Sequence, residues 1–156
     1  FHVCLPFNIH ETPLVLSAEP KPQELASSLK ILLAEDDAVT SMVILKLIGR
    51  LGIHAKAVEN GQQALKELAE GAYDIVLMDV QMPEMDGVEA TRAIREGKAG
   101  EKNKKIPIIA LTAYAMVGDR EKFLAAGMDE YVSKPVELNA LCGVIRKFEG
   151  EHRHAQ

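Results

Sequence analysis

Short apolar runs alternate along this chain with longer segments in which apolar residues recur at helical spacing. The runs at 31–34, 75–78 and 108–111 are continuous, and mixed segments lie at 54–58 and 130–133, so strands are expected at 30–34, 54–58, 75–79, 108–112 and 130–133. Continuous runs of this length are typical of strands buried on both faces of a parallel sheet, and the segments between them are long enough for crossover helices. The pattern therefore predicts five βα units that form a three-layer, doubly wound α/β domain by right-handed crossovers.

The segments that follow the runs are predicted to form the helices. The dipeptide Asn60-Gly61 often marks a hairpin, but the apolar residues that follow it have helical spacing, so we expect Asn60 to cap a helix that ends at Gly71. Gly52 is expected to follow the C-terminus of the first helix. Besides the helix between Asn60 and Gly71, helices are expected at 38–51, 88–95, 117–126 and from Pro135 to about Phe148.

Most of the predicted strands stop at polar residues of the kind that handle phosphate or metal. In an open parallel sheet, ligands bind beside the carboxyl ends of the strands, so these residues are expected to lie together. Acids combined with one hydroxyl and one ammonium suit Mg²⁺ and a phosphoryl group. The residues are Glu35, Asp36, Asp37, Asp79, Thr112 and Lys134.

The composition of the 156 residues is that of one soluble globular domain with some flanking chain. The net charge of −5 offers no footprint for nucleic acid, and the lysines within 102–105 are expected to form a solvated loop. No stretch is long and apolar enough to span a membrane. Because only Cys4 and Cys142 are present, a disulfide framework is not expected and a reducing, cytoplasmic compartment is favoured.

The chain is expected to divide into three parts. A compact domain is predicted at 30–148, with the end of another domain and a linker before it at 1–29 and a disordered tail after it at 149–156. Two prolines within 19–22 indicate the linker. Because the chain begins at Phe1 and lacks the pattern of a signal peptide, we expect it to be a piece of a longer protein.

Four segments at the predicted strand ends match one family in both order and separation. They are Leu-Ala-Glu-Asp-Asp at 33–37, Met-Asp-Val-Gln-Met-Pro-Glu-Met-Asp-Gly at 78–87, Leu-Thr-Ala at 111–113 and Tyr-Val-Ser-Lys-Pro at 131–135. Together they resemble the receiver domain of two-component response regulators, over about residues 30–148. The resemblance implies a CheY-like, flavodoxin-like fold with sheet order 2-1-3-4-5 and a role as phosphoacceptor in a phosphorelay.

The resemblance also implies a metal site around the phosphoacceptor, which would be Asp79. By this comparison Asp36, Asp79 and the backbone carbonyl of Gln81 bind Mg²⁺ directly, and Glu35 acts mostly through water. Three converging carboxylates would repel one another without a cation, so a divalent ion is physically reasonable here. Asp37 is expected to cap the first helix instead of binding the metal.

Further roles follow from the same resemblance. Lys134, which precedes a proline expected to be cis, and Thr112 would each contact a phosphate oxygen. Thr112 and Tyr131 would form a switch in which the ring turns inward as the hydroxyl moves to the phosphate; the alternative is that Tyr131 is simply a half-buried strand aromatic. Gln81 and Tyr114 would flank the path of the attacking water and tune the lifetime of the phosphoryl group.

The phosphodonor is expected on another domain or another chain. His10 does not lie in the helical His-Glu-x-x-x-Pro context of sensor-kinase phosphodonors. The expected partner is therefore the dimerisation and phosphoacceptor domain of a histidine kinase, or a histidine phosphotransfer protein. The predicted helix at 38–51 has more apolar residues than one buried stripe needs, and the surplus indicates either a docking patch for such a partner or broad burial.

Residues 1–7 suggest what the longer protein is. Phe-His-Val-Cys-Leu-Pro-Phe resembles the closing strand of the histidine-kinase ATP-binding domain. We therefore expect the C-terminal receiver of a hybrid sensor histidine kinase, in which the parent chain is the kinase and the receiver is not a conventional enzyme. A stand-alone CheY-like response regulator is the alternative.

Two other functions use related chemistry. A haloacid-dehalogenase-type phosphatase also combines a strand-end Asp with Mg²⁺, but it needs a second Asp where Gln81 stands. A flavodoxin-like FMN carrier needs a phosphate loop after the first strand, and the acidic residues at 35–37 would repel phosphate. Both are therefore less favoured than a receiver.

Overall fold

The computed structural model describes residues 29–113 and 116–154. Strands and helices alternate throughout this part of the chain, and each predicted strand is found with the bounds expected from the sequence. The segment expected to end a preceding domain, at 1–29, lies almost entirely outside the described residues. The elements are β1 (Lys30–Ala34), α1 (Ala38–Arg50), β2 (His54–Val58), α2 (Gly61–Glu70), β3 (Ile75–Asp79), α3 (Gly87–Arg95), a 3₁₀ turn η2 (Glu101–Asn103), β4 (Ile108–Thr112), α4 (Val117–Ala126), β5 (Glu130–Ser133) and α5 (Leu138–His154).

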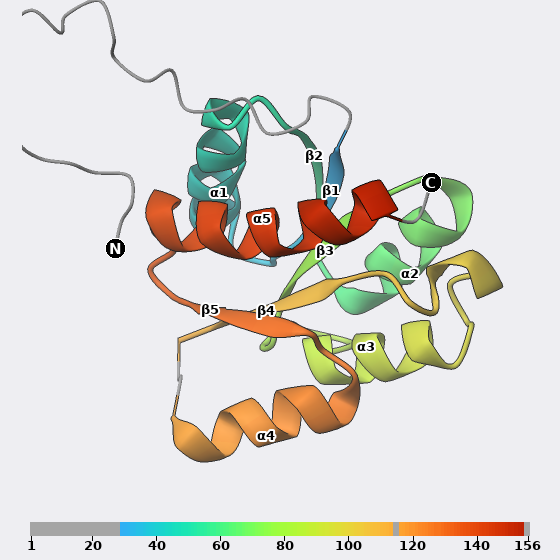
Figure 1. Ribbon diagram of the computed structural model, residues 1–156. Coiled ribbons are helices and arrows are strands. Elements are labelled where there is room, and N and C mark those ends of the chain that lie inside the picture. The colour runs from blue at the N-terminus through green and yellow to red at the C-terminus, as the bar shows by residue number, and fades with distance from the viewer. Residues whose placement is uncertain (1–28, 114–115, 155–156) are drawn as a thin grey trace, which may run out of the picture.

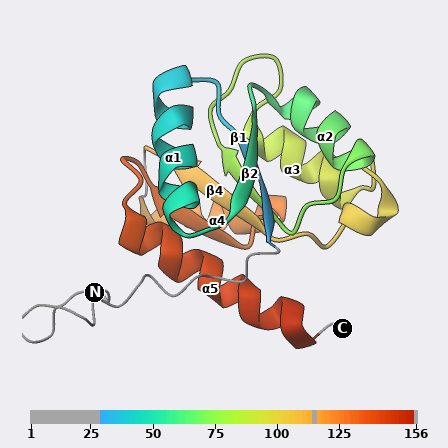
Figure 2. The same cartoon turned by 90° about the horizontal axis from the view of Figure 1, so that it is seen from above.

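The strands form one parallel sheet in the order β2-β1-β3-β4-β5, which confirms the predicted α/β fold and strand order. Figures 1 and 2 show α1 and α5 together on one face of the sheet and α2 and α3 on the other. The carboxyl ends of β1, β3, β4 and β5 therefore meet at one edge, where the polar residues were expected to gather.

Alternate residues of the central strands build two separate cores. Ile31 and Leu33 of β1 belong to a cluster with the buried residues of α1 and α5, whereas Leu32 and Ala34 belong to one with those of α2, α3 and α4. All four side chains are fully buried. Burial on both faces explains why the strands read as continuous apolar runs, and it fixes the register that brings the polar strand ends together.

The helix starts agree with the sequence. The side chain of Asp37 accepts from Thr40 N at 2.9 Å, and that of Asn60 accepts from Gln63 N at 2.8 Å, so both cap helices as expected. Asp86 forms a capping box with Glu89, and α3 begins at Gly87, one residue before the predicted start. Side-chain caps satisfy backbone N–H groups that have no partner in the first turn.

The end of the last helix was predicted wrongly. The sequence favoured an end near Phe148 and a disordered tail at 149–156, whereas α5 continues to His154. Phe148 is the last large apolar residue of the chain, and it packs against the core cluster that includes α1 and α5. A helix needs no apolar residue to continue, however, and the sequence beyond Phe148 has no proline that would stop it.

Gly87 allows α3 to start directly against the end of β3. A Cβ atom at this position would lie 2.2 Å from the carbonyl oxygen of Asp79, a backbone atom that cannot swing aside. The Gly87 amide also donates to Val80 O at 3.0 Å and closes the loop between β3 and α3. The position of the Asp79 backbone thus depends on the lack of a side chain at residue 87.

We expect Gly87→Ala to destabilise the domain by about 2 kcal/mol or more, because the new methyl group displaces β3 from α3. Gly143→Ala is the matched control, since nothing lies within 4 Å of a Cβ atom there and alanine favours the interior of α5 by about 0.5–1 kcal/mol. Urea unfolding of both variants measures the difference. Equal midpoints for the two would contradict the close contact at Gly87.

Candidate functional site

The polar ends of four strands line one cleft of about 340 Å³. β1 leads into it through Glu35, Asp36 and Asp37, and β3 ends there at Asp79. β4 contributes Thr112, and the segment after β5 contributes Lys134. Val80, Gln81 and Ala113 complete the lining. The structure therefore brings together the acids, the hydroxyl and the ammonium that the sequence predicted.

The three carboxylates of Glu35, Asp36 and Asp79 converge closely. One oxygen from each lies within 4.8 Å of the others. Glu35 and Asp79 are 3% and 4% exposed, whereas Asp36 is open to solvent, so two negative charges are removed from water and one is not. Such an arrangement requires a nearby positive charge, because buried carboxylates that repel one another otherwise take up protons.

Lys134 supplies part of that charge. Its ammonium lies 2.7 Å from Glu35 Oε2 and 3.1 Å from Asp79 Oδ1, and the bond to Pro135 is cis, as expected. The resemblance implied a contact of Lys134 with a phosphate oxygen, and the pair with Glu35 was not predicted. Lys134 N also donates to Thr112 O at 2.8 Å, which holds this segment beside β4.

The pKa values of Glu35 and Lys134 reflect the balance between burial and opposite charge in the cleft. Burial, assisted by Asp79, raises the pKa of Glu35 from 4.5 to about 7, although Lys134 opposes the shift. Burial lowers the pKa of Lys134, but its bonds to Glu35 and Asp79 outweigh burial and leave the pKa above the ordinary value. One ammonium therefore does not fully compensate the buried acids.

The cleft fits a magnesium ion. Its side-chain donors are carboxylate oxygens, which Mg²⁺ prefers, and the exposed Asp36 leaves room for the water ligands that this ion keeps. Oε2 of Glu35 is buried and forms an ion pair with Lys134. Among the described residues it has no hydrogen-bond partner of good geometry. Gln81 N donates to Asp79 Oδ1 at 3.2 Å, so the residue whose carbonyl was expected to bind the metal lies directly beside Asp79.

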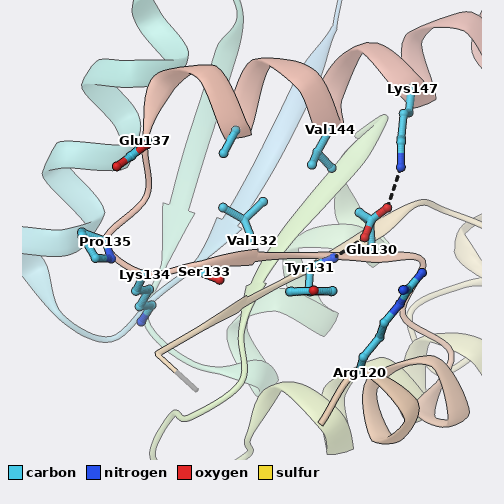
Figure 3. Close-up of a pocket in the computed structure, with 11 residues that line it drawn as sticks. Arg120, Glu130, Tyr131, Val132, Ser133, Lys134, Pro135, Glu137, Val144 and Lys147 are labelled. Carbon is cyan, nitrogen blue, oxygen red and sulfur yellow. Dashed lines mark hydrogen bonds and ion pairs between the residues drawn. The ribbon is translucent and has the colours of Figure 1, made fainter. Parts of the chain in front are cut away.

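The expected switch residues lie in different surroundings. Thr112 is buried and lines the cleft, whereas Tyr131 is half-buried on β5, packs against the core beneath α2, α3 and α4, and is not among the residues lining the cleft. Figure 3 shows Tyr131 in a groove between α4 and α5, near the ion pair of Lys147 with Glu130 at 2.8 Å. Tyr114 lies outside the described residues.

The surplus of apolar residues on α1 is exposed beside the cleft. Val39, Met42 and Val43 are 70%, 57% and 47% exposed, whereas Ile44 and Ile48 are fully buried. A hollow of about 510 Å³, lined in part by Met42, Glu35 and Asp36, joins this surface to the acidic cluster. The burial of Ile44 and Ile48 accounts for only part of the apolar pattern of this helix.

The model of the response regulator receiver domain family matches residues 31–146. The chain belongs to this family. The match leaves the phosphatase and flavin-carrier alternatives without support, and it agrees with the fold, strand order and cleft described above. The receiver is of the kind that occurs in hybrid histidine kinases of two-component phosphorelays.

Three similar proteins illustrate that context. Hybrid signal transduction histidine kinase I of Dictyostelium discoideum is 46% identical over 121 residues, which cover 74% of this chain and 7% of that protein. The receiver domain of the sensor histidine kinase PA1611 of Pseudomonas aeruginosa, solved with a magnesium ion in its active-site cleft, is 41% identical, with a TM-score of 0.71 and coverage of 78% and 98%. The receiver domain of Ssk1 of Saccharomyces cerevisiae, solved with the histidine phosphotransfer protein Ypd1, is 29% identical, with a TM-score of 0.72 and coverage of 80% and 90%.

The curated relatives are much longer than this chain, which spans between 4% and 20% of their length. Their activity as whole proteins therefore does not transfer directly to this segment. None of the helices that the structure describes has the apolar length needed to cross a bilayer.

We expect the stability of the metal-free domain to fall as the pH rises from about 4.5 to about 7. Folding raises the pKa of the Glu35 carboxyl, so this group stabilises the folded state fully when the pH is below its pKa in the unfolded chain. The stabilisation is lost as the pH rises past its pKa in the folded protein. Lys134 keeps its charge over this range. Glu35→Gln cannot ionise and should remove on the order of 2 kcal/mol of this dependence, measured by urea unfolding at a series of pH values.

Glu70→Gln is the control for this measurement, because Glu70 is an exposed acid on α2. Its profile should follow that of the parent protein. A Glu35→Gln variant with the parent's pH profile would contradict the raised pKa of Glu35.

Proposed function

We propose that this receiver accepts a phosphoryl group on Asp79 from a phosphohistidine, with Mg²⁺, in a cytoplasmic phosphorelay. The observation that carries the proposal is the convergence of Glu35, Asp36 and Asp79 within 4.8 Å, beside the ammonium of Lys134. The similarity to hybrid kinases supports a parent chain of that class, in which the kinase domain makes the phosphohistidine. The receiver would then catalyse its own phosphorylation and dephosphorylation.

Asp79 is suited to be the nucleophile. It ends β3, its backbone is held by the contact with Gly87, and Gln81 N donates to its Oδ1 at 3.2 Å. An Asp79 oxygen would attack the phosphorus of the phosphohistidine, and the bond between phosphorus and the imidazole nitrogen would break. The electron pair of that bond leaves with the imidazole, and the product is an aspartyl phosphate.

Lys134 and Thr112 would stabilise the added charge. Aspartyl phosphate brings about −1.5 to −2 charges into the cleft. The Lys134 ammonium, which bridges Glu35 and Asp79 at 2.7 and 3.1 Å, can turn to a phosphate oxygen by a short movement. Thr112 lines the same cleft and would offer its hydroxyl to another oxygen, while the small Ala113 beside it leaves space for the group.

The metal would be held by Asp36, Asp79 and the carbonyl of Gln81, with Glu35 acting through water. When bound, Mg²⁺ neutralises the charge on the transferring phosphoryl group and orients its oxygens. The magnesium ion in the active-site cleft of the related PA1611 receiver supports a magnesium ion in this cleft. Binding would also favour the ionised form of Glu35, whose pKa is raised when no metal is present.

The switch would run from Thr112 to Tyr131. Movement of the Thr112 hydroxyl toward the phosphate would open space below β5, into which the half-buried ring of Tyr131 could turn. Gln81 and Tyr114 would tune the lifetime of the phosphoryl group. These roles rest on the resemblance to other receivers and on the burial of Thr112 beside the cleft.

The phosphodonor would dock on α1. Val39, Met42 and Val43 form an apolar patch beside the acidic cleft, and apolar contact here would place a donor histidine close to Asp79. The donor would be the helical phosphoacceptor domain of a histidine kinase or a histidine phosphotransfer protein. The complex of the Ssk1 receiver with Ypd1 supports the second kind of partner.

We expect Asp79→Asn to abolish labelling by a phosphorylated histidine phosphotransfer protein, because an amide oxygen cannot form the acyl phosphate. Radioactive phosphotransfer with Mg²⁺, followed by peptide mapping, measures this. Asp119→Asn, on α4, is the control and should be labelled like the parent. Undiminished labelling of Asp79→Asn would refute the assignment of Asp79.

We expect Val43→Glu to slow transfer from a protein donor by about tenfold or more, because it places a charge in the apolar contact. Leu124→Glu is a matched control, since Leu124 on α4 is also 47% exposed and α4 lies away from α1 (Figure 1). Both variants should accept phosphoryl from acetyl phosphate at the parent's rate. Equal transfer rates from the protein donor would exclude α1 as the docking surface.

A further inference from the structure

The loop between β3 and α3 contains Gln81 and is held together by hydrogen bonds between its own backbone groups. Gly87 N donates to Val80 O at 3.0 Å, and Met85 N donates to Pro83 O at 2.7 Å. These bonds fix the shape of the loop. The start of the loop is also tied to the sheet, because Val80 N donates to Leu111 O of β4 at 3.1 Å.

Two hydrogen bonds tie the loop to the corner between β2 and α2. Asn60 Nδ2 donates to Glu84 Oε2 at 3.2 Å, and Gly61 N donates to Met85 O at 3.2 Å. The two backbones also touch, because a Cβ atom at Gly61 would lie 2.8 Å from both Met85 O and Met85 Cγ. Asn60 and Gly61 therefore pack against the loop between β3 and α3 and support it from the side of α2.

Glu84 occupies a backbone conformation that normally suits glycine. Its φ is +67°, and it is the only non-glycine residue with positive φ in the described part of the chain. A side chain in this region costs roughly 1–2 kcal/mol. Such a conformation persists only when the surroundings impose it, and the Glu84 side chain accepts a hydrogen bond from Asn60.

We propose that Asn60 and Glu84 are positioning residues for the metal site, acting through the loop to hold the Gln81 carbonyl against Asp79. Asn60 is suited to two tasks at once. Its Oδ1 caps α2 by accepting from Gln63 N at 2.8 Å, while its Nδ2 reaches the loop. The inference rests on the proposed Mg²⁺ site, since the loop would supply the Gln81 carbonyl oxygen as a ligand of that ion.

The test compares Mg²⁺ affinity, by calorimetry, with stability, by urea unfolding, in variants of the two residues. Asn60→Ser keeps a capping oxygen but loses the bond to Glu84, and Glu84→Ala loses the same bond from the other side. Each should weaken Mg²⁺ binding about three- to tenfold, at or below the lower end of the range of about 10- to 100-fold for residues that support metal ligands. The double variant should be no weaker than either single variant, because both remove one interaction.

Two further variants separate positioning from charge and from simple structural support. Glu84→Gln keeps an acceptor for Asn60 but loses the negative charge, and it should bind Mg²⁺ within twofold of the parent. Glu84→Gly relieves the positive φ, so it should be at least as stable as the parent while binding Mg²⁺ as weakly as Glu84→Ala. A purely structural role would move stability and affinity in the same direction.

A second measurement needs no metal. In the metal-free protein, hydrogen exchange at the Gly61 amide, which donates to the loop, should be faster in Asn60→Ser and Glu84→Ala than in the parent and in Glu84→Gln. Unchanged exchange and unchanged Mg²⁺ affinity in these variants would overturn the positioning role and leave the proposed function standing. Loss of affinity in Glu84→Gln equal to that in Glu84→Ala would also overturn it. A parent protein that binds no Mg²⁺ would overturn both proposals.

Discussion

The buried carboxylates of Glu35 and Asp79 are the constraint on which the rest of this structure depends. Two acids that are almost completely removed from water share a single ammonium, that of Lys134, at 2.7 and 3.1 Å. The raised pKa of Glu35 shows that this compensation is incomplete. An imbalance of this kind favours a divalent cation, and under the proposed function that cation would prepare Asp79 to accept a phosphoryl group.

The fold maintains this arrangement against the repulsion between the acids. Burial of β1 and β3 on both faces fixes their register, and residues 31–34 pair with 75–78 so that Glu35 and Asp79 follow at the same level. Because residue 87 is glycine, α3 packs directly against the carbonyl group of Asp79. The hydrogen bond from Lys134 N to Thr112 O holds the lysine beside β4. The corner at Asn60 and Gly61 adds a lateral support for the loop that follows Asp79.

The sequence predicted the parts of the molecule that depend on local pattern. The strands β1, β3 and β4 were found at the expected residues because continuous apolar runs bounded by polar residues leave little freedom in their ends, and the cap at Asn60 followed from the helical spacing after it. The length of α5 was not predictable from apolar spacing, because the last turns do not rely on burial.

The pairing of Lys134 with Glu35 and the contact between Asn60 and Glu84 join residues 99 and 24 positions apart, so no local pattern encodes them. Sequence reasoning could name the surplus apolar residues of α1, but only the structure shows that Val39, Met42 and Val43 are the exposed ones.

The most direct test of this account is a magnesium titration of the unphosphorylated domain, followed by ¹³C NMR of the side-chain carboxyl groups. The account expects the signals of Glu35, Asp36 and Asp79 to shift together with one affinity, and it expects Glu35 to titrate at a lower pH once the ion is bound. Carboxyl signals that stay in place, while signals elsewhere in the domain respond to the ion, would contradict it.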